Sequence, residues 1–394
     1  MSNCPRIRIG IVGTGFVSRG FVLVLNRHEE FVVSRVLTRR NRQDCTDYPY
    51  QELLTNSVAE LINHSDILVE CSGDVIHATA VIDQALKANL PVVTMDSEFH
   101  VTTGSYFVGK GMCTEAEGDQ PGCLAAFRED IVQMGFKPLV YGSVKGFLNK
   151  NPTPKEMEYW ATRQGISFNQ ATSFTDGTKA QIEQALVANG LDATIIRQGL
   201  LGPVAENLLD GALILAGYAS KLGEAISDYV LSADSASSVF IVAEHDESQR
   251  ECLRYFRLGD GPSYLLVRNY HLVHLEIIKT VKRVINGKGK LLDNSAVPKI
   301  GVAAIAKRNL KIGERIVRGI GSFDVRGEAV LINDFPDSVP IGLLYNATMI
   351  RNVDEGQMIS SQDVALNESL AVSAWEDIKR RALTHGRSDI RISC

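Results

Sequence analysis

The sequence lacks long hydrophobic runs, a strong charge of one sign and paired cysteines. No apolar run approaches the roughly 18–20 residues that span a bilayer, so we expect no membrane contact. The formal net charge is only −5, and no basic surface for nucleic acid is expected. The seven cysteines include no C-x-x-C pair, which indicates reduced thiols rather than disulfides or a structural zinc site. Because the N-terminus also lacks a signal-peptide layout, we expect a cytoplasmic protein.

The apolar pattern divides the 394 residues, too many for one ordinary core, into three expected domains. Over residues 1–145, short apolar runs alternate with amphipathic stretches, which predicts parallel βαβ units and a doubly wound Rossmann sheet. FKPLVYGSVKG is expected to add a strand at the edge of that sheet. Residues 146–295 indicate an α+β catalytic domain, in which VFIVAEH and CLRYFRLG are expected as antiparallel strands. Residues 296–394 indicate a small β-rich domain with a C-terminal helix, so the predicted fold class is α/β.

The stretch GIVGTGFVSRG resembles a dinucleotide-binding fingerprint between a strand and a helix. Gly13 permits a tight turn, and Gly15 lets the backbone approach a pyrophosphate. Phe16 and Val17 begin the helix whose N–H groups face that anion. Ser18 stands at the third fingerprint position, where a small residue keeps helix and strand close. We therefore predict a nucleotide-binding site.

The end of the second predicted strand favours NADP(H) over NAD(H). An NAD enzyme normally carries an acid there for the ribose hydroxyls, whereas LTRRNR has none. Thr38, Arg39 and Arg40 can instead bind a 2′-phosphate, although a solvated basic loop is the alternative. Ser72 and Gly73, in ECSGD, end another strand at the same edge and are expected to line the nicotinamide side.

Three stretches carry the polar candidates. The loop TEAEGDQPG falls between two Rossmann elements, where loops reach over the nicotinamide, and GSVKGFLNKNPT lies where the middle domain begins, the usual place for a cleft. The third, FTDGTKAQIE, stands where a loop becomes a helix. The expected catalytic residues are Lys145, Asp176, Lys179, Glu117 and Asp119, and the expected substrate-binding residues are Gln120, Asn149, Thr175 and Glu98.

The stretch FTDGTKAQIE can be explained by structure or by chemistry. Thr178 and Gln181 fit a capping box, and Lys179 and Glu183 fit an i,i+4 ion pair. That explanation leaves Asp176 without a role, because Thr178 already serves as the cap. We therefore predict that Asp176 and Lys179 bind substrate or handle protons.

Several longer stretches resemble a known family: TEAEGDQPG, VYGSVKGFLNKNPT, WATRQGISFNQATSFTDGTKAQIE, RLGDGPSYLLVRNYHLVHLE and AAIAKRNLKIGE. They are similar to homoserine-dehydrogenase-like oxidoreductases with a C-terminal SAF domain. The best-known activity of that family is the deoxyxylulose-5-phosphate reductoisomerase-like enzyme of isoprenoid precursor synthesis. Homoserine dehydrogenases place an Asp and a Lys four apart on one helix, whereas Asp176 and Lys179 are three apart. They also place a Lys after the strand matching VVTMDSE, where this sequence has Ser97 and Glu98.

The resemblance implies NADPH-dependent reduction of a small phosphorylated or polar hydroxy-carbonyl substrate, with isomerisation as an open addition. Lys145 and Lys179 would bind substrate oxygens and stabilise alkoxide charge, and Asp176 or an acid of the 115–119 loop would be the general base. Isomerisation would be helped by a divalent metal, for which Glu115, Glu117 and Asp119 offer oxygens, but the sequence does not require one.

Two alternatives stay open: a homoserine-dehydrogenase-like or sugar or hydroxy-acid dehydrogenase without isomerisation, and a non-catalytic NADPH-binding sensor. His271, His274 and Glu276 in YHLVHLE are expected in the core or an interface rather than at a metal. We expect a homo-oligomer, a dimer or a tetramer.

Overall fold

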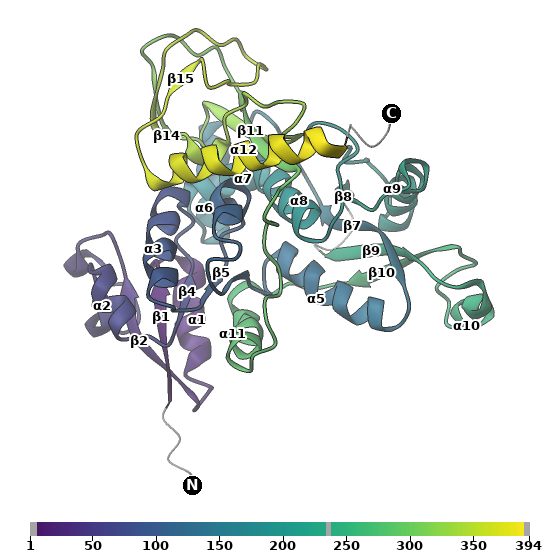
Figure 1. Cartoon of the computed structure of the whole chain (residues 1–394), viewed down its shortest axis with the longest axis horizontal. Helices are drawn as coiled ribbons and strands as arrows, with labels where there is room; N and C mark the ends of the chain where they lie inside the picture. The colour runs from purple at the N-terminus through teal and green to yellow at the C-terminus, as the bar shows by residue number, and fades with distance from the viewer. Residues whose placement is uncertain (1–5, 234–237, 390–394) are drawn as a thin grey trace.

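The first sheet carries the fingerprint and is formed by the N-terminal part of the chain. The structure, a computed structural model, describes residues 6–233 and 238–389 (Figure 1). Six parallel strands form the sheet in the order β3-β2-β1-β4-β5-β6, which confirms the predicted α/β fold with a Rossmann-like sheet. The strands are β1 (Ile7–Val12), β2 (Phe31–Leu37), β3 (Leu54–Thr55), β4 (Ile67–Glu70), β5 (Val92–Thr94) and β6 (Cys113–Glu115).

Helices cover both faces of this sheet. β1 is buried from Ile9 onward and β4 throughout, as parallel strands covered on both sides must be. The core on one face includes side chains of α1 (Phe16–Leu25) and α11 (Ile277–Ile285). The core on the other face includes side chains of α2 (Val58–Asn63), α3 (Val75–Lys87) and α4 (Ser97–Thr103). Because α11 follows the second sheet in sequence, the chain returns to the first sheet to complete its core.

The second sheet has the order β10-β9-β7-β8 and mixes parallel with antiparallel pairing. Its strands are β7 (Lys137–Lys145), β8 (Ile226–Leu231), β9 (Val239–Glu244) and β10 (Ser263–Arg268). α5 (Gln120–Gln133) and α8 (Thr178–Gly190) pack on one face, and α9 (Leu208–Leu222) packs on the other.

Two sequence predictions in this region are wrong. The strand expected at the edge of the first sheet is β7, which lies inside the second sheet between β8 and β9. Its continuous buried run shows that a strand is present but not which sheet it joins. No strand forms at CLRYFRLG: its first half lies in α10 (Arg250–Tyr255), which continues from the short helix η4 (Glu247–Gln249) capped by Asp246, and its second half is turn. The Asp246 cap starts a helix here, and its effect outweighs the apolar spacing that indicated a strand.

Two short helices lie between β7 and α8. α6 (Pro154–Gln164) begins at the predicted capping box of Thr153 and Glu156 and ends at Gly165, whose φ is 67°. α7 (Phe168–Thr175) begins at a second capping box, formed by Ser167 and Gln170. These caps satisfy backbone N–H groups that a helix start otherwise leaves without partners.

The C-terminal part is β-rich and contacts both other parts (Figure 1). β11 (Ile300–Ala306) pairs with β13 (Val325–Leu331), and α8 packs against both. β12 (Arg315–Arg318), β14 (Tyr345–Met349) and β15 (Val364–Ala365) form a second small sheet. The closing helix α12 (Leu370–Asp389) contacts α3 and α4 of the first part. We call residues 296–389 the C-terminal module.

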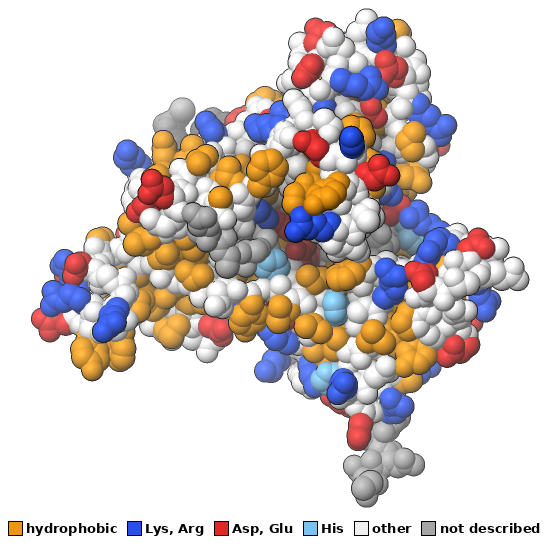
Figure 2. Space-filling model, turned by 180° about the vertical axis from the view of Figure 1, so that it is seen from behind, with side chains coloured by type: hydrophobic (Ala, Val, Ile, Leu, Met, Phe, Trp, Pro, Cys, Tyr) orange, Lys and Arg blue, Asp and Glu red, His pale blue; other side chains and the backbone are white. Residues whose placement is uncertain are grey.

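The outer surface near the second sheet is apolar. Figure 2 shows hydrophobic side chains gathered on the half of the molecule that holds this sheet. α9 exposes Leu209, Leu213, Ile214, Tyr218 and Leu222. Within the described residues, no helix combines the length and apolar character needed to cross a membrane. The five described cysteines are free thiols, and Cys4 and Cys394 lie outside the described residues.

Candidate active site

The fingerprint loop has the geometry that a dinucleotide diphosphate needs. Gly13 has a φ of 103°, and a Cβ there would lie 2.9 Å from the carbonyl oxygen of Cys71. Gly15 is the N-cap of α1 and makes no side-chain cap, and a Cβ on it would meet open space. The first N–H groups of α1 therefore remain available for an anion. Ser18 is fully buried, and its hydroxyl is 2.7 Å from the hydroxyl of Tyr48.

The basic loop after β2 borders a small cavity of about 350 Å³. Arg40 donates a hydrogen bond to Thr14 Oγ1 at 3.0 Å, and Thr38 Oγ1 accepts one from the Arg40 N–H at 3.2 Å. Arg39 forms a 2.8 Å ion pair with Asp74, the N-cap residue of α3. Burial would raise the pKa of Asp74, but the His77 N–H and the Arg39 charge hold it below its usual value. Among the described residues, Arg40 makes no ion pair with a carboxylate. Its guanidinium charge is therefore available to a phosphate.

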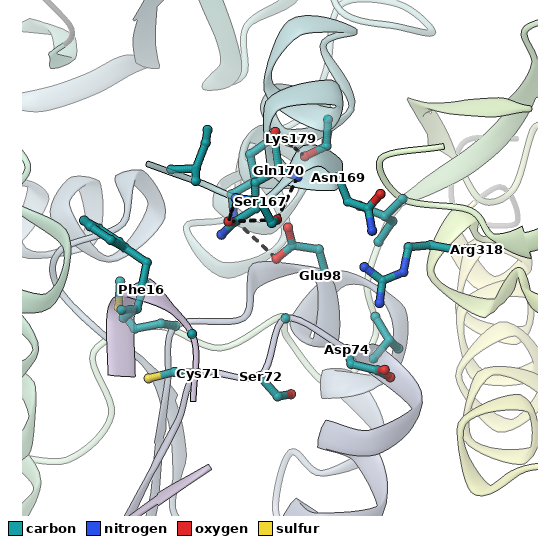
Figure 3. A pocket seen from close by; sticks show the side chains of 18 of the residues that line it. Phe16, Cys71, Ser72, Asp74, Glu98, Ser167, Asn169, Gln170, Lys179 and Arg318 are labelled. Atoms are coloured by element: carbon teal, nitrogen blue, oxygen red, sulfur yellow. Dashed lines mark hydrogen bonds and ion pairs between the residues drawn. The ribbon is translucent and has the colours of Figure 1, made fainter. Parts of the chain in front are cut away.

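A larger cavity, which we call the cofactor cavity, runs along the carboxyl edge of the first sheet (Figure 3). Its volume is about 630 Å³, and it begins at the Thr14–Val17 loop. It passes Ser72, Gly73 and Asp74 and reaches Glu98, Asp119 and Lys179. Its opposite wall comes from α7 and from Arg318 and Tyr345 of the C-terminal module. The glycine cradle, the open helix terminus and the nearby basic loop fit a nicotinamide dinucleotide, as ligands in open α/β sheets bind at this edge.

A second cavity of about 790 Å³, the substrate cavity, meets the first. Val144, Met157, Trp160 and Phe174 contribute apolar lining. Its polar lining includes Gln120, Lys145, Asn149, Glu156, Gln164, Thr175, Glu183 and His271, with Asp119 and Lys179. Lys179 and Asp119 line both cavities. Their shared position places an ammonium and a carboxylate at the junction.

Lys179 is held between two carboxylates. Its Nζ lies 2.9 Å from Asp119 Oδ2 and 3.2 Å from Glu98 Oε2. Burial alone would lower the pKa of Lys179, but the charges of Asp119 and Glu98 raise it well above its ordinary value. Burial opposes ionisation of Asp119 as well, yet the Lys179 ammonium brings the pKa of Asp119 down to about 2. At neutral pH the junction therefore holds a protonated amine beside an ionised acid.

Lys145 forms a second polar cluster in the substrate cavity. Its Nζ lies 2.9 Å from both Gln120 Oε1 and Glu183 Oε2. Burial raises the pKa of Glu183 to about 7, although the Lys145 charge opposes the rise. Burial also lowers the pKa of His271, which favours its neutral form. Glu183 therefore titrates near neutral pH.

The predicted pairing of Asp176 with Lys179 is not present. Asp176 is fully buried, pairs with Lys307 of the C-terminal module, and accepts a hydrogen bond from the Thr178 N–H at 2.8 Å. It lines neither cavity. Lys179 reaches the junction instead, because α8 begins two residues later and turns its side chain toward Asp119.

The structural explanation of this stretch is also wrong in its details. The N-cap of α8 is Gly177, with a φ of 86° and no side-chain cap. The Thr178 hydroxyl accepts a hydrogen bond from the Gly327 N–H, and Gln181 accepts one from the Ala329 N–H. Lys179 and Glu183 bind different partners rather than each other. These four side chains therefore bind residues that are distant in sequence, instead of forming the capping box and the i,i+4 ion pair that the sequence indicated.

The acidic loop does not form a metal site in this arrangement. Glu117 forms ion pairs with Arg268 and Lys279 and lines neither cavity, so its expected place in the cleft is wrong. Glu115 is fully buried, and its pKa is raised well above the usual range by burial and by the Asp119 charge. Ser97 bridges Glu115 and Asp119 by hydrogen bonds of 3.1 and 3.2 Å. Within residues 6–233 and 238–389, no cluster of three metal-ligating side chains is found.

The remaining expected residues fall on both sides of the junction. Gln120, Asn149 and Thr175 line the substrate cavity, whereas Glu98 lines the cofactor cavity. His274 packs edge-on against Phe16, and Glu276 pairs with Arg268 and Lys279. Sequence reasoning missed Arg318, for which no local motif gave a signal, and the pairing of Lys179 with Asp119.

Residues 118–277 match the family model described as the catalytic domain of oxidoreductase DRL. The match includes Asp119, Lys145 and Lys179. The chain is an oxidoreductase. Neither this family model nor the structures named below is described as a homoserine dehydrogenase, a reductoisomerase or an SAF protein. That finer part of the expected resemblance is therefore not supported.

The solved structures that match the chain are distant. The UDP-N-acetylglucosamine 3-dehydrogenase from Acidithiobacillus ferrooxidans shares 11% identity at a TM-score of 0.44, over 74% of this chain and 93% of that chain. A probable dehydrogenase from Thermotoga maritima shares 14% identity at a TM-score of 0.41, over 73% and 91%. A putative NADPH-dependent oxidoreductase from Desulfitobacterium hafniense shares 12% identity at a TM-score of 0.40, over 74% and 90%. No curated protein matches the chain. Likeness at this level says nothing about the substrate.

Proposed function

We propose that the protein is an NADPH-dependent dehydrogenase that interconverts a hydroxyl and a carbonyl group on a small polar molecule. It would act on CH–OH donors without rearranging the carbon skeleton. The observation that carries this proposal is the junction: Lys179 and Asp119 line both the cofactor cavity and the substrate cavity. A substrate carbon at the junction would therefore face the dinucleotide and the ammonium together.

The residues at the junction can handle the charge and the proton of such a reaction. When bound, the nicotinamide cofactor supplies or accepts the hydride. Lys179 would donate a hydrogen bond to the substrate oxygen and stabilise the negative charge that grows there during reduction. Its ammonium would then give up a proton to that oxygen, and Asp119 and Glu98 would hold the amine in position.

The second cluster favours an uncharged polar substrate over a phosphorylated one. Lys145 is already paired with Glu183, and Lys179 is paired with Asp119 and Glu98. The substrate cavity thus presents no lysine without a carboxylate partner, although a phosphate group needs uncompensated cations. Gln120, Asn149 and Thr175 can bind hydroxyl groups, and Met157 and Trp160 can pack against carbon–hydrogen surface.

NADPH is proposed over NADH because of the loop after β2. Arg40 and Thr38 border the small cavity at the end of that strand, and no acid of LTRRNR is present to bind ribose hydroxyls. Reductoisomerase chemistry is the less favoured candidate, because the Glu117 carboxylate is ion-paired with Arg268 and Lys279.

A homo-oligomer is also proposed. The exposed apolar side chains of α9 offer a surface for it, which sedimentation analysis can test.

Cofactor oxidation in the presence of neutral and phosphorylated hydroxy-carbonyl compounds tests the proposal. Lys179→Met should lower turnover of the best substrate by at least about 100-fold, because removing one oxyanion-stabilising donor costs that much. Lys87→Met, at the exposed end of α3 and outside both cavities, is the matched control and should leave turnover unchanged. Full turnover by K179M would contradict the proposed role. Tight NADPH binding without turnover of any carbonyl compound would instead favour the sensor.

A further inference from the structure

One cation of the cofactor cavity belongs to the C-terminal module. Arg318, the last residue of β12, is half-buried and points into the cavity from the wall opposite the first sheet (Figure 3). Two of the other three cationic side chains that line this cavity are ion-paired, Arg19 with Asp47 and Lys179 with two carboxylates. The third, Arg40, donates a hydrogen bond only to the Thr14 hydroxyl and also borders the small cavity at the end of β2. Within the described chain, the Arg318 guanidinium makes neither an ion pair nor a hydrogen bond.

The backbone around Arg318 is fixed against both walls of the cleft. A Cβ on Gly321 would lie 2.2 Å from the carbonyl oxygen of Asn169 in α7. A Cβ on Gly342 would lie 2.4 Å from Thr102 Oγ1 of α4. Because glycine has no Cβ, the C-terminal module approaches α7 and α4 at these two positions more closely than any other residue would allow. Arg318 is therefore held on a packed support rather than on a free loop.

A guanidinium in this position needs an anion. Its planar set of N–H donors matches the paired oxygens of a phosphate, and leaving such a group half-buried without a partner is unfavourable. The Arg318 charge acts on the nearby carboxylate of Asp74, but that carboxylate forms its ion pair with Arg39. Arg318 lines the cofactor cavity but not the substrate cavity, so its partner belongs to the dinucleotide.

We infer that Arg318 binds the diphosphate of the dinucleotide from the side opposite the N-terminus of α1. The C-terminal module then supplies part of the cofactor site and covers the bound cofactor, a role that nothing in the fingerprint indicates. This inference rests on the proposed function, because it requires a dinucleotide in the cofactor cavity. The diphosphate, rather than the 2′-phosphate, is assigned because Arg40 borders both the cofactor cavity and the small cavity at the end of β2, whereas Arg318 lines the cofactor cavity alone.

Calorimetric titration of the full-length protein with NADPH and with NADH tests this assignment without any substrate. Arg318→Met should weaken both cofactors by the same factor, about 10- to 100-fold, the usual effect of losing a charge-assisted hydrogen bond. Arg315→Met, an exposed arginine on the same strand that does not line the cavity, is the matched control and should bind like the wild type. Unchanged thermal unfolding of Arg318→Met shows that the variant folds, and Arg318→Lys should bind between the two.

The outcomes separate this inference from the proposed function. If the wild type binds NADPH and Arg318→Met binds it equally well, the assignment of Arg318 fails while the proposed function stands. Weaker binding of NADPH alone would overturn the diphosphate assignment in favour of a 2′-phosphate contact. If the wild type binds neither cofactor, the proposed function and this inference fail together.

Discussion

Replacing Lys307 with Met should destabilise the protein far more than removing a surface lysine. Lys307 and Asp176 pair with side chains only 4% and 0% exposed. The variant would leave the Asp176 carboxyl buried without its cation, with the Thr178 N–H as its remaining hydrogen-bond donor. Removing one partner of a buried ion pair typically costs about 3–5 kcal/mol. We therefore expect a loss of that size in the free energy of unfolding.

Urea unfolding followed by circular dichroism at pH 7 measures this effect. The double variant Asp176→Asn with Lys307→Met should recover much of the loss, because it leaves no uncompensated buried charge. Lys87→Met breaks an exposed pair with Asp83 and should change stability little. If Lys307→Met loses no more stability than Lys87→Met, the reasoning about the buried pair is wrong. Folded Asp176→Asn should also retain turnover, which a general base at this position would not allow.

Three further variants test the site. Glu183→Gln should gain stability relative to the wild type as pH rises from about 5 through 7, because the raised pKa of Glu183 makes its ionisation costly in the folded state. The rise of the Glu183 pKa from its ordinary 4.5 to about 7 is worth on the order of 3 kcal/mol, and a pH-independent difference in urea midpoints would refute it. Gly13→Ala should weaken NADPH binding at least about 10-fold in calorimetry, since its Cβ would meet Cys71 at a φ of 103°. Arg40→Met should weaken NADPH but not NADH, and equal weakening of both would argue against a 2′-phosphate contact.

The sequence predicted the elements that short-range chemistry controls. The first sheet was predictable because buried parallel strands alternate with helices, and the turn at Gly13 needs a residue that tolerates positive φ. The α6 cap was predictable because Thr153 and Glu156 satisfy backbone N–H groups within one turn. Lys145 was expected at the cleft because it lies where the middle domain begins, and Lys179 because it stands near a helix start in a stretch that resembles homoserine dehydrogenases. Both line the substrate cavity.

The remainder depended on partners that are distant in sequence. Asp176 was expected to act beside Lys179, but its partner is Lys307, 131 residues away. Nothing near position 176 signals that strand β11 will end beside it. Arg318 was missed for the same reason, since its place at the cofactor cavity is set by how the C-terminal module packs on α4 and α7. β7 was misplaced because a strand buried on both faces has the same pattern in either sheet.

The central claim is that the nicotinamide ring lies at the junction where Lys179 and Asp119 line both cavities. A crystal structure with bound NADP⁺ tests it most directly. The account predicts a ring in contact with Lys179, its reactive face open to the substrate cavity. A dinucleotide whose nicotinamide lies out of contact with Lys179, or points away from the substrate cavity, would contradict the account.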